Sequence, residues 1–368
     1  MKIKVLVISD YREMVSVRPE AEIFVGLQKE GFDITVMTYP GTAYGEKFKS
    51  AGIRIIEFHP EKKFHRPSIR FIRKELKQGG YHILQLFNSK AFLNGIIAAR
   101  NLPVKVVLYR GYKGHIHWYD PAMYFKYLHP RTDKIICVTK AIEDDIRRNS
   151  IFVKHKGITI HKGHDPEWYQ DVKPISSFEQ FGIPANAFVL ICTANVRRMK
   201  GIPYLLKATP FLPQGEPIHF LFAGKDFDKP GILQLIDKSP YKKNIHCIGY
   251  VKDPLPLVAA SDIFVMPSVR GEGINKAVVE AMALGIPPVV TDIPGNEVLV
   301  INNLTGLMVP AKNPQALAKA IITLYTNRDL RKKLGANARE HIKNNLNIVS
   351  TIQKTKALYI SLASEPTR

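Results

Sequence analysis

The stretch IFVMPSVRGEGINKAVVEAMA, residues 263–283, joins three patterns that together indicate an α/β fold. The apolar run at 263–266 predicts a short buried strand. A glycine-flanked loop follows, and a helix is expected to begin near Ile274. Since the same strand–loop–helix order recurs along the chain, the segment predicts a parallel sheet covered by helices on both faces.

Outward from this stretch, strand-like runs alternate with helical patterns in two blocks, which predicts two doubly wound domains. We expect a linker over 165–184, where prolines are frequent and apolar periodicity is weak. A last amphipathic stretch, 348–362, has no strand after it and must dock on an existing surface. The expected strands are 4–9, 33–38, 53–58, 82–87, 104–109 and 134–139 in the first block, and 188–194, 218–223, 245–248, 263–266 and 288–291 in the second.

Length and composition agree with this division. The chain has 368 residues, enough for two domains, and its 45% hydrophobic content excludes wholesale disorder. No apolar run approaches the roughly 20 residues of a membrane span, and the first residues predict a strand rather than a secretory leader. The unusual quantity is the charge, which is +21 from 53 Lys and Arg against 32 Asp and Glu.

Three cysteines, Cys137, Cys192 and Cys247, lie far apart within apolar runs. An odd number without a C-x-x-C pair argues against disulfides and against a zinc site. We expect all three to be small residues in buried strands of a cytosolic protein.

Two carboxylates flank the predicted helix start of the opening stretch. Glu272 precedes the helix and Glu280 lies about two turns inside it, which separates them by roughly 10 to 12 Å. That distance suits two hydroxyl-bearing ends of one ligand with a diphosphate between them, because unpaired amides at the helix start attract anions. Alternatively, Lys276 and Glu280 form only a solvated i, i+4 pair.

The second half of the chain resembles the retaining family-four glycosyltransferases. The resemblance rests on Glu272, seven intervening residues and Glu280, and continues through most of 187–345. It is weaker in the first half. It implies a GT-B architecture, with an acceptor-binding Rossmann-like domain at 1–170 and a nucleotide-sugar-binding one at 175–345 across a central cleft. It also implies that the closing helix, within 348–368, packs back on the first domain.

The resemblance also implies roles for particular residues. Glu272 is then the catalytic candidate that contacts the donor sugar, and Glu280 holds the ribose hydroxyls. The base of the nucleotide is expected near Tyr250 and Val251, which leaves UDP and GDP equally possible. Backbone groups that meet the sugar and the phosphates are those of Gly273, Ile274 and Asn275.

Positive charge for the leaving diphosphate is expected from the loop after the first strand of the second domain, since these enzymes use no bound metal and no other cofactor. Lys200 matches the family's lysine. Asn195 stands where the family has an arginine, so Arg197 or Arg198 is expected to reach the same phosphates. Asp226-Phe227-Asp228 spells a metal-binding D-x-D, but its setting does not suit that role.

The first domain departs further from the family pattern. Residues 17–20 replace its usual glycine pair, and Arg110 replaces a histidine. Arg18 and Arg110 would suit a phosphorylated or acidic acceptor. His115 and His117 could take part in acceptor binding; alternatively, they are ordinary loop histidines.

A basic segment at 62–113 holds twelve Lys and Arg and one acidic residue. Residues 66–78 could form a helix with Ile69, Ile72 and Leu76 inward and basic residues at 70, 73, 74 and 77 outward. Such a helix can lie on anionic lipid. The alternative is simply a soluble basic face, and no recognised module supports nucleic acid as a partner.

We therefore predict a metal-independent retaining glycosyltransferase, cytoplasmic and peripheral at the inner face of the plasma membrane. Its expected acceptor is a cell-envelope glycan, lipid-linked or lipopolysaccharide. The alternatives are a sugar-nucleotide epimerase or phosphorylase of GT-B fold, and a non-enzymatic basic protein that binds membrane or nucleic acid.

Overall fold

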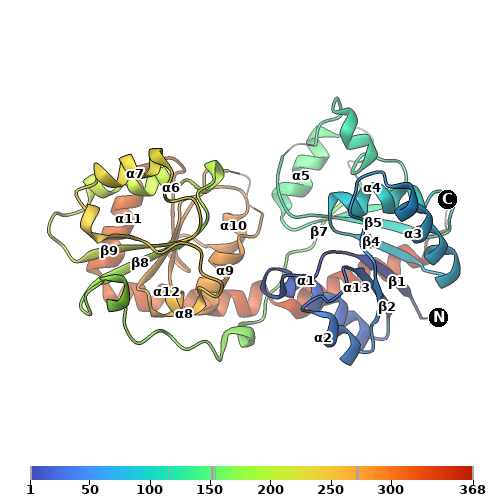
Figure 1. The fold of residues 1–368 in the computed structure, drawn as a ribbon, viewed down its shortest axis with the longest axis horizontal. Coiled ribbons are helices and arrows are strands. Elements are labelled where there is room, and N and C mark those ends of the chain that lie inside the picture. Colours follow the sequence, from blue (N-terminus) through green and yellow to red (C-terminus); the bar gives the residue numbers. More distant parts are fainter. Residues whose placement is uncertain (1, 115, 151–152, 154, 271–272, 367–368) are drawn as a thin grey trace. The chain divides into compact units, whose positions relative to one another are not determined.

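The computed structural model describes residues 2–114, 116–150, 153, 155–270 and 273–366. The chain divides into two compact units, Met1–Gly163 with Leu346–Arg368, and His164–Asn345. Each unit is a central sheet with helices on both faces (Figure 1). The division after Gly163 differs from the expected boundary at 170–175, whereas the closing helix belongs to the first unit, where the prediction put it.

In the described part of the first unit, seven parallel strands run in the order β3-β2-β1-β4-β5-β6-β7. Strand β1 is central, with Val7 opposite Val36 on β2 and Gln85 on β4. Four of its five residues are buried, as expected for a parallel sheet covered on both faces. The strands are β1 Lys4–Ile8, β2 Asp33–Thr38, β3 Arg54–Glu57, β4 Ile83–Leu86, β5 Lys105–Arg110, β6 Lys134–Cys137 and β7 Gly157–Thr159.

Helices α1 and α13 pack together on one face of this sheet, and α3 packs on α4 (Figure 1). The Tyr359 hydroxyl of α13 donates to the Gln85 side chain at 2.8 Å in the buried core, which fixes the final helix to β4. The helices are α1 Met14–Lys29, α2 Gly45–Ser50, α3 Arg66–Gly79, α4 Ser89–Ala98, the 3-10 helix η1 Pro121–Phe125, α5 Lys140–Asn149 and α13 Ile348–Ser364.

The second unit has six described parallel strands in the order β10-β9-β8-β11-β12-β13. Strands β8, β9, β11 and β12 are buried almost throughout, so they form the core of the unit. The strands are β8 Phe188–Thr193, β9 Ile218–Ala223, β10 Ile245–Cys247, β11 Ile263–Met266, β12 Pro288–Thr291 and β13 Leu307–Val309.

Around this second sheet, α12 packs on α9, and α11 packs on α6. The helices are η2 Pro166–Tyr169, η3 Glu179–Phe181, η4 Arg198–Lys200, α6 Ile202–Leu206, η5 Thr209–Phe211, α7 Pro230–Asp237, η6 Lys242–Asn244, α8 Leu255–Ala260, α9 Lys276–Ala283, α10 Asn296–Leu299, α11 Pro314–Thr326 and α12 Arg328–Asn345. None of the helices that the structure describes combines the length and hydropathy needed to cross a bilayer.

Residues 165–184 are not a free linker but part of the second unit. Their prolines begin or flank short 3-10 turns, and Tyr169 and Ile183 are buried. The Ile175 amide donates to the Pro256 carbonyl at 3.2 Å, which ties the segment to α8. The segment looks like a linker in sequence because 3-10 turns lack the periodicity of a longer helix.

The prediction that all three cysteines are buried is wrong for Cys247. Cys137 and Cys192 are buried in central strands, but Cys247 is exposed on β10. Strand β10 is the edge of its sheet and only three residues long, so one side of it lacks a neighbouring strand.

Candidate functional site

The strand order of the second sheet reverses direction between β8 and β11, which are neighbours. At such a switch point the loops after the two strands lead away to opposite sides, and ligands bind in the crevice between them. The loop after β8 carries Arg197, Arg198 and Lys200. The loop after β11 leads to α9, which carries Glu280. Arg197, Arg198, Lys200 and Glu280 therefore lie on the segments that follow the two strands of the switch point.

These two loops are bonded directly to each other. The Val269 amide donates to the Met199 carbonyl at 2.8 Å. Gly201, with φ +66°, lies so close to Pro267 that a Cβ atom there would be 1.9 Å from the Pro267 carbonyl oxygen. Only glycine fits this approach without displacing the backbone. The contact holds the basic turn η4 beside the start of the loop that follows β11.

The loops after β9 and β10 join the same edge of the sheet. The Asn195 side chain accepts a hydrogen bond from the Lys225 amide at 2.9 Å, and the Gly224 amide donates to the Gly249 carbonyl at 2.7 Å. The Lys225 ammonium lies 5.0 Å from the centre of the Tyr250 ring, which is 63% exposed. Asn195, where the family pattern has arginine, thus supports the next loop. Lys225 is a cation of this edge that the sequence analysis did not single out.

Helix α9 begins at Lys276, two residues later than predicted. Asn275 is its N-cap, and its side-chain oxygen accepts a hydrogen bond from the Ala277 amide at 3.2 Å. A capping asparagine fixes the start of a helix because it satisfies an amide that has no partner within the helix. The buried side-chain nitrogen of Asn275 has no hydrogen-bond partner among the described residues. Gly273 and Ile274 precede the cap, and Glu272 lies outside the described residues.

Glu280 is buried, with 6% of its surface exposed, and its carboxylate contacts the Lys276 ammonium one turn earlier. Burial raises the pKa of Glu280, while the charge of Lys276 lowers it. The carboxylate is therefore not part of a solvated stripe. Lys276 nevertheless gives it a partner, so the burial of Glu280 does not by itself require a ligand.

The first sheet has its own switch point, between β1 and β4. Polar residues that follow neighbouring strands meet there. Asp10, after β1, pairs with Arg12 at 2.7 Å, and the Arg12 guanidinium lies 4.0 Å from the centre of the Tyr39 ring. The ring of His59, after β3, stacks on the Tyr39 ring with the ring centres 4.4 Å apart, and its Nε2 lies 3.0 Å from the Asn88 amide nitrogen. Burial lowers the pKa of His59 to about 4.

The sequence analysis did not select this group, although each of its members directly follows a strand. That position is the signal that could have found it, since the carboxyl ends of parallel strands share one edge of the sheet. Two cavities, of about 400 and 420 Å³, lie beside it, the first lined by Asp10 and Arg12 and the second by Tyr39 and His59.

Of the predicted acceptor-side residues, Arg110 is 1% exposed. Its guanidinium lies 3.7 Å from the centre of the Tyr112 ring and donates to the Gly114 carbonyl, so it holds the loop after β5. His117 stacks on Tyr119, with ring centres 5.0 Å apart. Arg18 is half-buried within α1. His115 lies outside the described residues.

Two family models match the chain. One, described as glycosyl transferases group 1, matches residues 175–341, and the other, described as glycosyltransferase family 4, matches residues 21–168. The chain belongs to the family-four glycosyltransferases. The matches follow the two units, so each half of this glycosyltransferase carries its own part of the family pattern.

Relatives with assigned names include bacterial glycan-synthesising enzymes. The glycosyltransferase is 25% identical over 324 residues to the Escherichia coli UDP-Gal:alpha-D-GlcNAc-diphosphoundecaprenol alpha-1,3-galactosyltransferase, covering 80% of this chain and 79% of that one. It is 27% identical over 255 residues to an uncharacterized glycosyltransferase of Methanocaldococcus jannaschii, covering 67% of this chain. That match spans 63% of the archaeal relative, which is less than two thirds of its length.

Solved structures show the same architecture. A Rickettsia africae glycosyltransferase superposes with a TM-score of 0.82 at 18% identity, covering 99% of both chains. The Anabaena protein HepE, solved in complex with UDP, gives a TM-score of 0.78 at 19% identity, covering 98% of this chain and all of that one. Together with the two parallel sheets, these likenesses identify the fold of the glycosyltransferase as GT-B.

Proposed function

We propose that this glycosyltransferase transfers a sugar from a UDP-sugar or GDP-sugar donor to a cell-envelope glycan acceptor, lipid-linked or lipopolysaccharide, with retention at the anomeric carbon and without a metal ion. The main observation behind the proposal is the hydrogen bond between Val269 and Met199, which joins the loops after β8 and β11 at the switch point of the second sheet. It places the basic turn with Lys200 beside the loop that leads to Glu280. A cationic turn beside a helix that carries a buried carboxylate suits a ligand with a diphosphate next to hydroxyl groups, because the cations can bind the diphosphate and the carboxylate can accept hydrogen bonds from the hydroxyls.

In this proposal the donor spans the switch point. Lys200 with Arg197 or Arg198 binds the diphosphate, and Glu280 accepts hydrogen bonds from the ribose hydroxyls. The residues at the start of α9, Gly273, Ile274 and Asn275, meet the sugar and the phosphates. The side-chain nitrogen of Asn275 has no partner in the described part of the chain, which supports this assignment, because a buried donor without a partner is costly unless a ligand supplies the acceptor.

The nucleotide base is assigned to the edge near Tyr250 and Val251, where Lys225 approaches the Tyr250 ring. Two similar proteins favour uridine. The Escherichia coli relative is named for a UDP-galactose donor, and HepE was solved with UDP. We therefore place UDP ahead of GDP as the donor nucleotide.

For the chemistry, the bond between the anomeric carbon and the diphosphate oxygen breaks, and the acceptor hydroxyl oxygen bonds to the same face of that carbon. The hydroxyl proton passes to the departing phosphate oxygen. Lys200 and the neighbouring arginine stabilise the negative charge that develops on the diphosphate, so no metal is required. Glu272 is assigned to the donor sugar as the catalytic residue.

On the acceptor side, the group at the first switch point is the supported candidate. Asp10 and Arg12 border one cavity and are partly exposed, so they can bind hydroxyl or acidic groups. Arg110 acts through the loop that it holds and is a positioning residue. Arg18 and His117 are retained as acceptor-side residues because of their charge and position alone.

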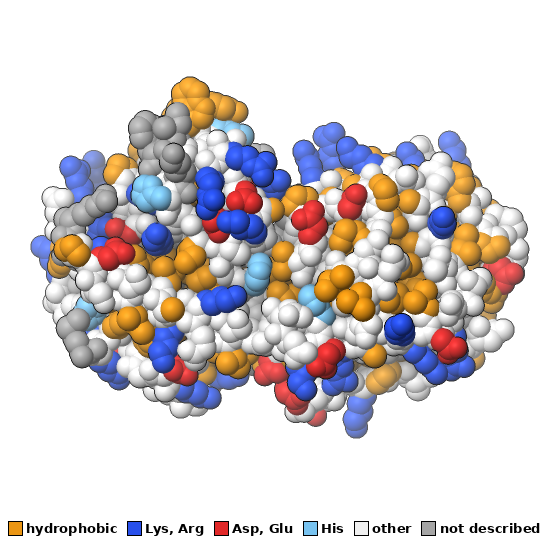
Figure 2. Space-filling view, turned by 180° about the vertical axis from the view of Figure 1, so that it is seen from behind, with side chains coloured by type: hydrophobic (Ala, Val, Ile, Leu, Met, Phe, Trp, Pro, Cys, Tyr) orange, Lys and Arg blue, Asp and Glu red, His pale blue; other side chains and the backbone are white. Residues whose placement is uncertain are grey.

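We propose that the first unit also docks on anionic membrane. Helix α3 buries Ile72 and Leu76 and exposes Arg70, Lys74 and Lys77. Arg73 does not face outward as predicted, because it donates to the carbonyls of Ala98 and Arg100 at the end of α4. Figure 2 shows hydrophobic and basic side chains together on one face of the molecule. Exposed aromatic side chains of the first unit include Phe64, Phe71, Trp118, Tyr119 and Phe125. Aromatic and basic side chains together favour a lipid interface.

The proposed function is tested by supplying UDP- and GDP-sugars with a short lipid-linked acceptor and determining the product by NMR. We expect an α-linked product from an α-linked donor, and loss of transfer in Glu272→Ala. A β-linked product would contradict retention. Isomerised sugar nucleotide formed without any acceptor would instead support the epimerase alternative.

A further inference from the structure

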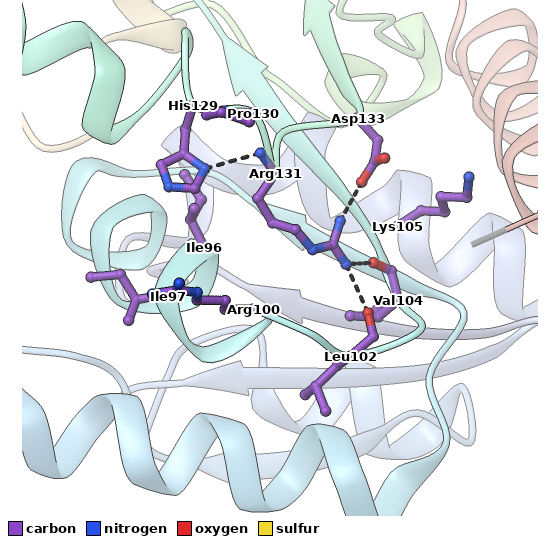
Figure 3. A pocket seen from close by; sticks show the side chains of 10 residues that line it. All are labelled: Ile96, Ile97, Arg100, Leu102, Val104, Lys105, His129, Pro130, Arg131 and Asp133. Atoms are coloured by element: carbon purple, nitrogen blue, oxygen red, sulfur yellow. Dashed lines mark hydrogen bonds and ion pairs between the residues drawn. The ribbon is translucent and has the colours of Figure 1, made fainter. Parts of the chain in front are cut away.

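A cavity of about 520 Å³ opens on the first unit at the edge where strands β5 and β6 begin. This is the opposite edge of the sheet from the group around His59, because parallel strands all begin at one edge and end at the other. Its apolar lining includes Ile96, Ile97 and Leu102. Its polar lining includes Arg100 and His129 (Figure 3).

Arg131 builds the wall of this cavity, and most of its guanidinium N–H groups are already bonded within the chain. It pairs with Asp133 at 2.8 Å and donates to the carbonyls of Ala99, Leu102 and Val104. Figure 3 places it between His129 and Arg100 on one side and Lys105 on the other. The wall is thus fixed by several charge-assisted hydrogen bonds, and Asp133 is neutralised by its partner.

The Lys105 end of the cavity is already closed by the chain. The Lys105 side chain is 7% exposed, and its ammonium lies 3.3 Å from the Glu365 carboxylate and 3.1 Å from the Pro366 carbonyl. Arg100 lies at the opposite end of the cavity (Figure 3). Arg100 is exposed, and among the described residues its guanidinium has no acidic partner.

His129 lies at the Arg100 end of the cavity and has a hydrogen-bond donor on its ring. Its Nδ1 accepts the Arg131 amide at 3.0 Å, so the ring hydrogen of the neutral imidazole is on Nε2. Burial lowers the pKa of His129, and the charges of Lys156, Arg131 and Arg100 act in the same direction. Of these cations Arg131 faces Asp133, and Lys156 donates to the Pro130 carbonyl. The imidazole is therefore a neutral N–H donor surrounded by positive charge.

We propose that this cavity binds a phosphate ester with an apolar organic part, the phosphate lying between the Arg100 guanidinium and the Nε2–H of His129. A phosphate offers several acceptor oxygens to donors that arrive from different directions, which an arginine and an imidazole do here. The volume far exceeds that of a phosphate ion, and Ile96, Ile97 and Leu102 supply an apolar surface for the rest of the ligand. The site stands apart from the proposed donor chemistry and does not depend on it.

The ester could come from a soluble metabolite or from a lipid headgroup. Arg73 of α3 bonds to the Arg100 carbonyl, so the cavity adjoins the helix whose outer face is basic. The shared chemistry is the phosphate ester, and the two sources are separated by competition with vesicles.

The test follows the His129 imidazole of the full chain by NMR during titration with inorganic phosphate and with hexyl phosphate. We expect saturable binding, a His129 pKa that rises by about one unit when the site is filled, and hexyl phosphate binding at least about tenfold tighter than inorganic phosphate. Arg100→Gln should weaken hexyl phosphate at least about tenfold. Arg148→Gln, which removes an exposed cation of α5, should leave it unchanged.

Equal weakening by Arg100→Gln and Arg148→Gln would overturn the proposal, because it would show only general attraction to a basic surface. Absence of any hexyl phosphate binding would overturn it too. His129→Gln provides a second variant that should weaken binding without removing a charge. Displacement of hexyl phosphate by phosphatidylglycerol vesicles would identify the ligand as a lipid headgroup, and binding without displacement would identify a soluble ester; both support the site.

Discussion

The Val269 amide donates to the Met199 carbonyl at 2.8 Å, and this bond joins the loops after β8 and β11. These are the two strands between which the second sheet reverses its direction. The bond therefore sets the spacing between the cationic turn of η4 and the loop that leads into α9. Any change that separates the two loops should impair donor binding even though it touches no donor-binding side chain.

Gly201→Ala tests this arrangement. The new Cβ would lie 1.9 Å from the Pro267 carbonyl oxygen, so the loops must move apart. We expect UDP affinity to fall at least about tenfold, measured by calorimetry. The control is Gly182→Ala, where φ is +74° but nothing lies within 4 Å; it should cost only the roughly 1–2 kcal/mol of a left-handed alanine and leave affinity intact. Similar affinities for both variants would show that the loop contact is unimportant.

Glu280→Gln separates a ligand-binding carboxylate from a structural one. Because burial raises the pKa of Glu280, the neutral amide should be tolerated with little loss of stability. If Glu280 binds the ribose, UDP affinity should fall by about 1.5–3 kcal/mol, which is roughly tenfold to more than a hundredfold.

Lys276→Met is the matched variant for Glu280→Gln. It leaves the buried carboxylate without its partner and should lower the free energy of unfolding by at least about 1–3 kcal/mol in denaturant titration. Unchanged UDP affinity in Glu280→Gln, with a stability loss only in Lys276→Met, would reduce the pair to a structural one.

The sequence predicts features that depend on neighbouring residues better than features that depend on contacts between distant residues. The predicted bounds of strands such as 33–38 and 263–266 are the observed ones, because a local run of apolar residues indicates a buried strand. The start of α9 was placed two residues early, because Asn275 was not recognised as its cap. The sequence shows that Asn195 departs from the family pattern, but it does not show the bond to the Lys225 amide, which joins the loops after two different strands.

The group around His59 was missed for the same reason. Its members follow four different strands, at residues 10–12, 39, 59 and 88, and only the strand order brings them together. Arg110 shows the converse case, because its charge suggested an acceptor contact while its buried guanidinium serves the loop at Gly114. Local patterns thus reveal elements, and pairings between strands decide which polar side chains meet.

His59 gives the first unit a specific dependence of stability on pH. Its pKa is lowered to about 4 by burial, and the nearby cations Lys90 and Arg12 act in the same direction while Asp10 opposes them. The unfolded chain, with a pKa near 6.5, takes up a proton before the folded chain does. Stability is therefore complete above pH 6.5 and falls as the pH drops toward 4.

Denaturant titrations at pH 7 and pH 5 check this dependence. The contribution of His59 should fall by about 2 kcal/mol between pH 7 and pH 5. His59→Gln should show a correspondingly shallower loss than the unmodified chain. Parallel curves for the two proteins would show that the imidazole of His59 is not responsible.

Membrane docking predicts a position-specific effect of charge. Replacing Arg70, Lys74 and Lys77 by glutamine should weaken the binding free energy for phosphatidylglycerol vesicles by about 3 kcal/mol. The affinity measured by co-sedimentation should then fall roughly 150-fold. Arg73 is left in place because it supports the end of α4. The control removes the same charge from α12, by glutamine at 332, 333 and 339, which are exposed in the second unit. Equal losses for both triple variants would point to net charge rather than to a docking face.

The central claim is that the second unit binds a nucleoside diphosphate at the switch point beside Lys200. A thermal-shift panel of UDP, GDP, ADP and CMP tests it most directly. At one hundred times its dissociation constant a nucleotide stabilises the fold by about 2.7 kcal/mol, enough for a melting shift of several degrees. We predict such a shift with UDP, or with GDP, and its loss in Lys200→Ala. A panel in which no nucleoside diphosphate raises the melting temperature, or in which Lys200→Ala responds as the unmodified chain does, would contradict the account.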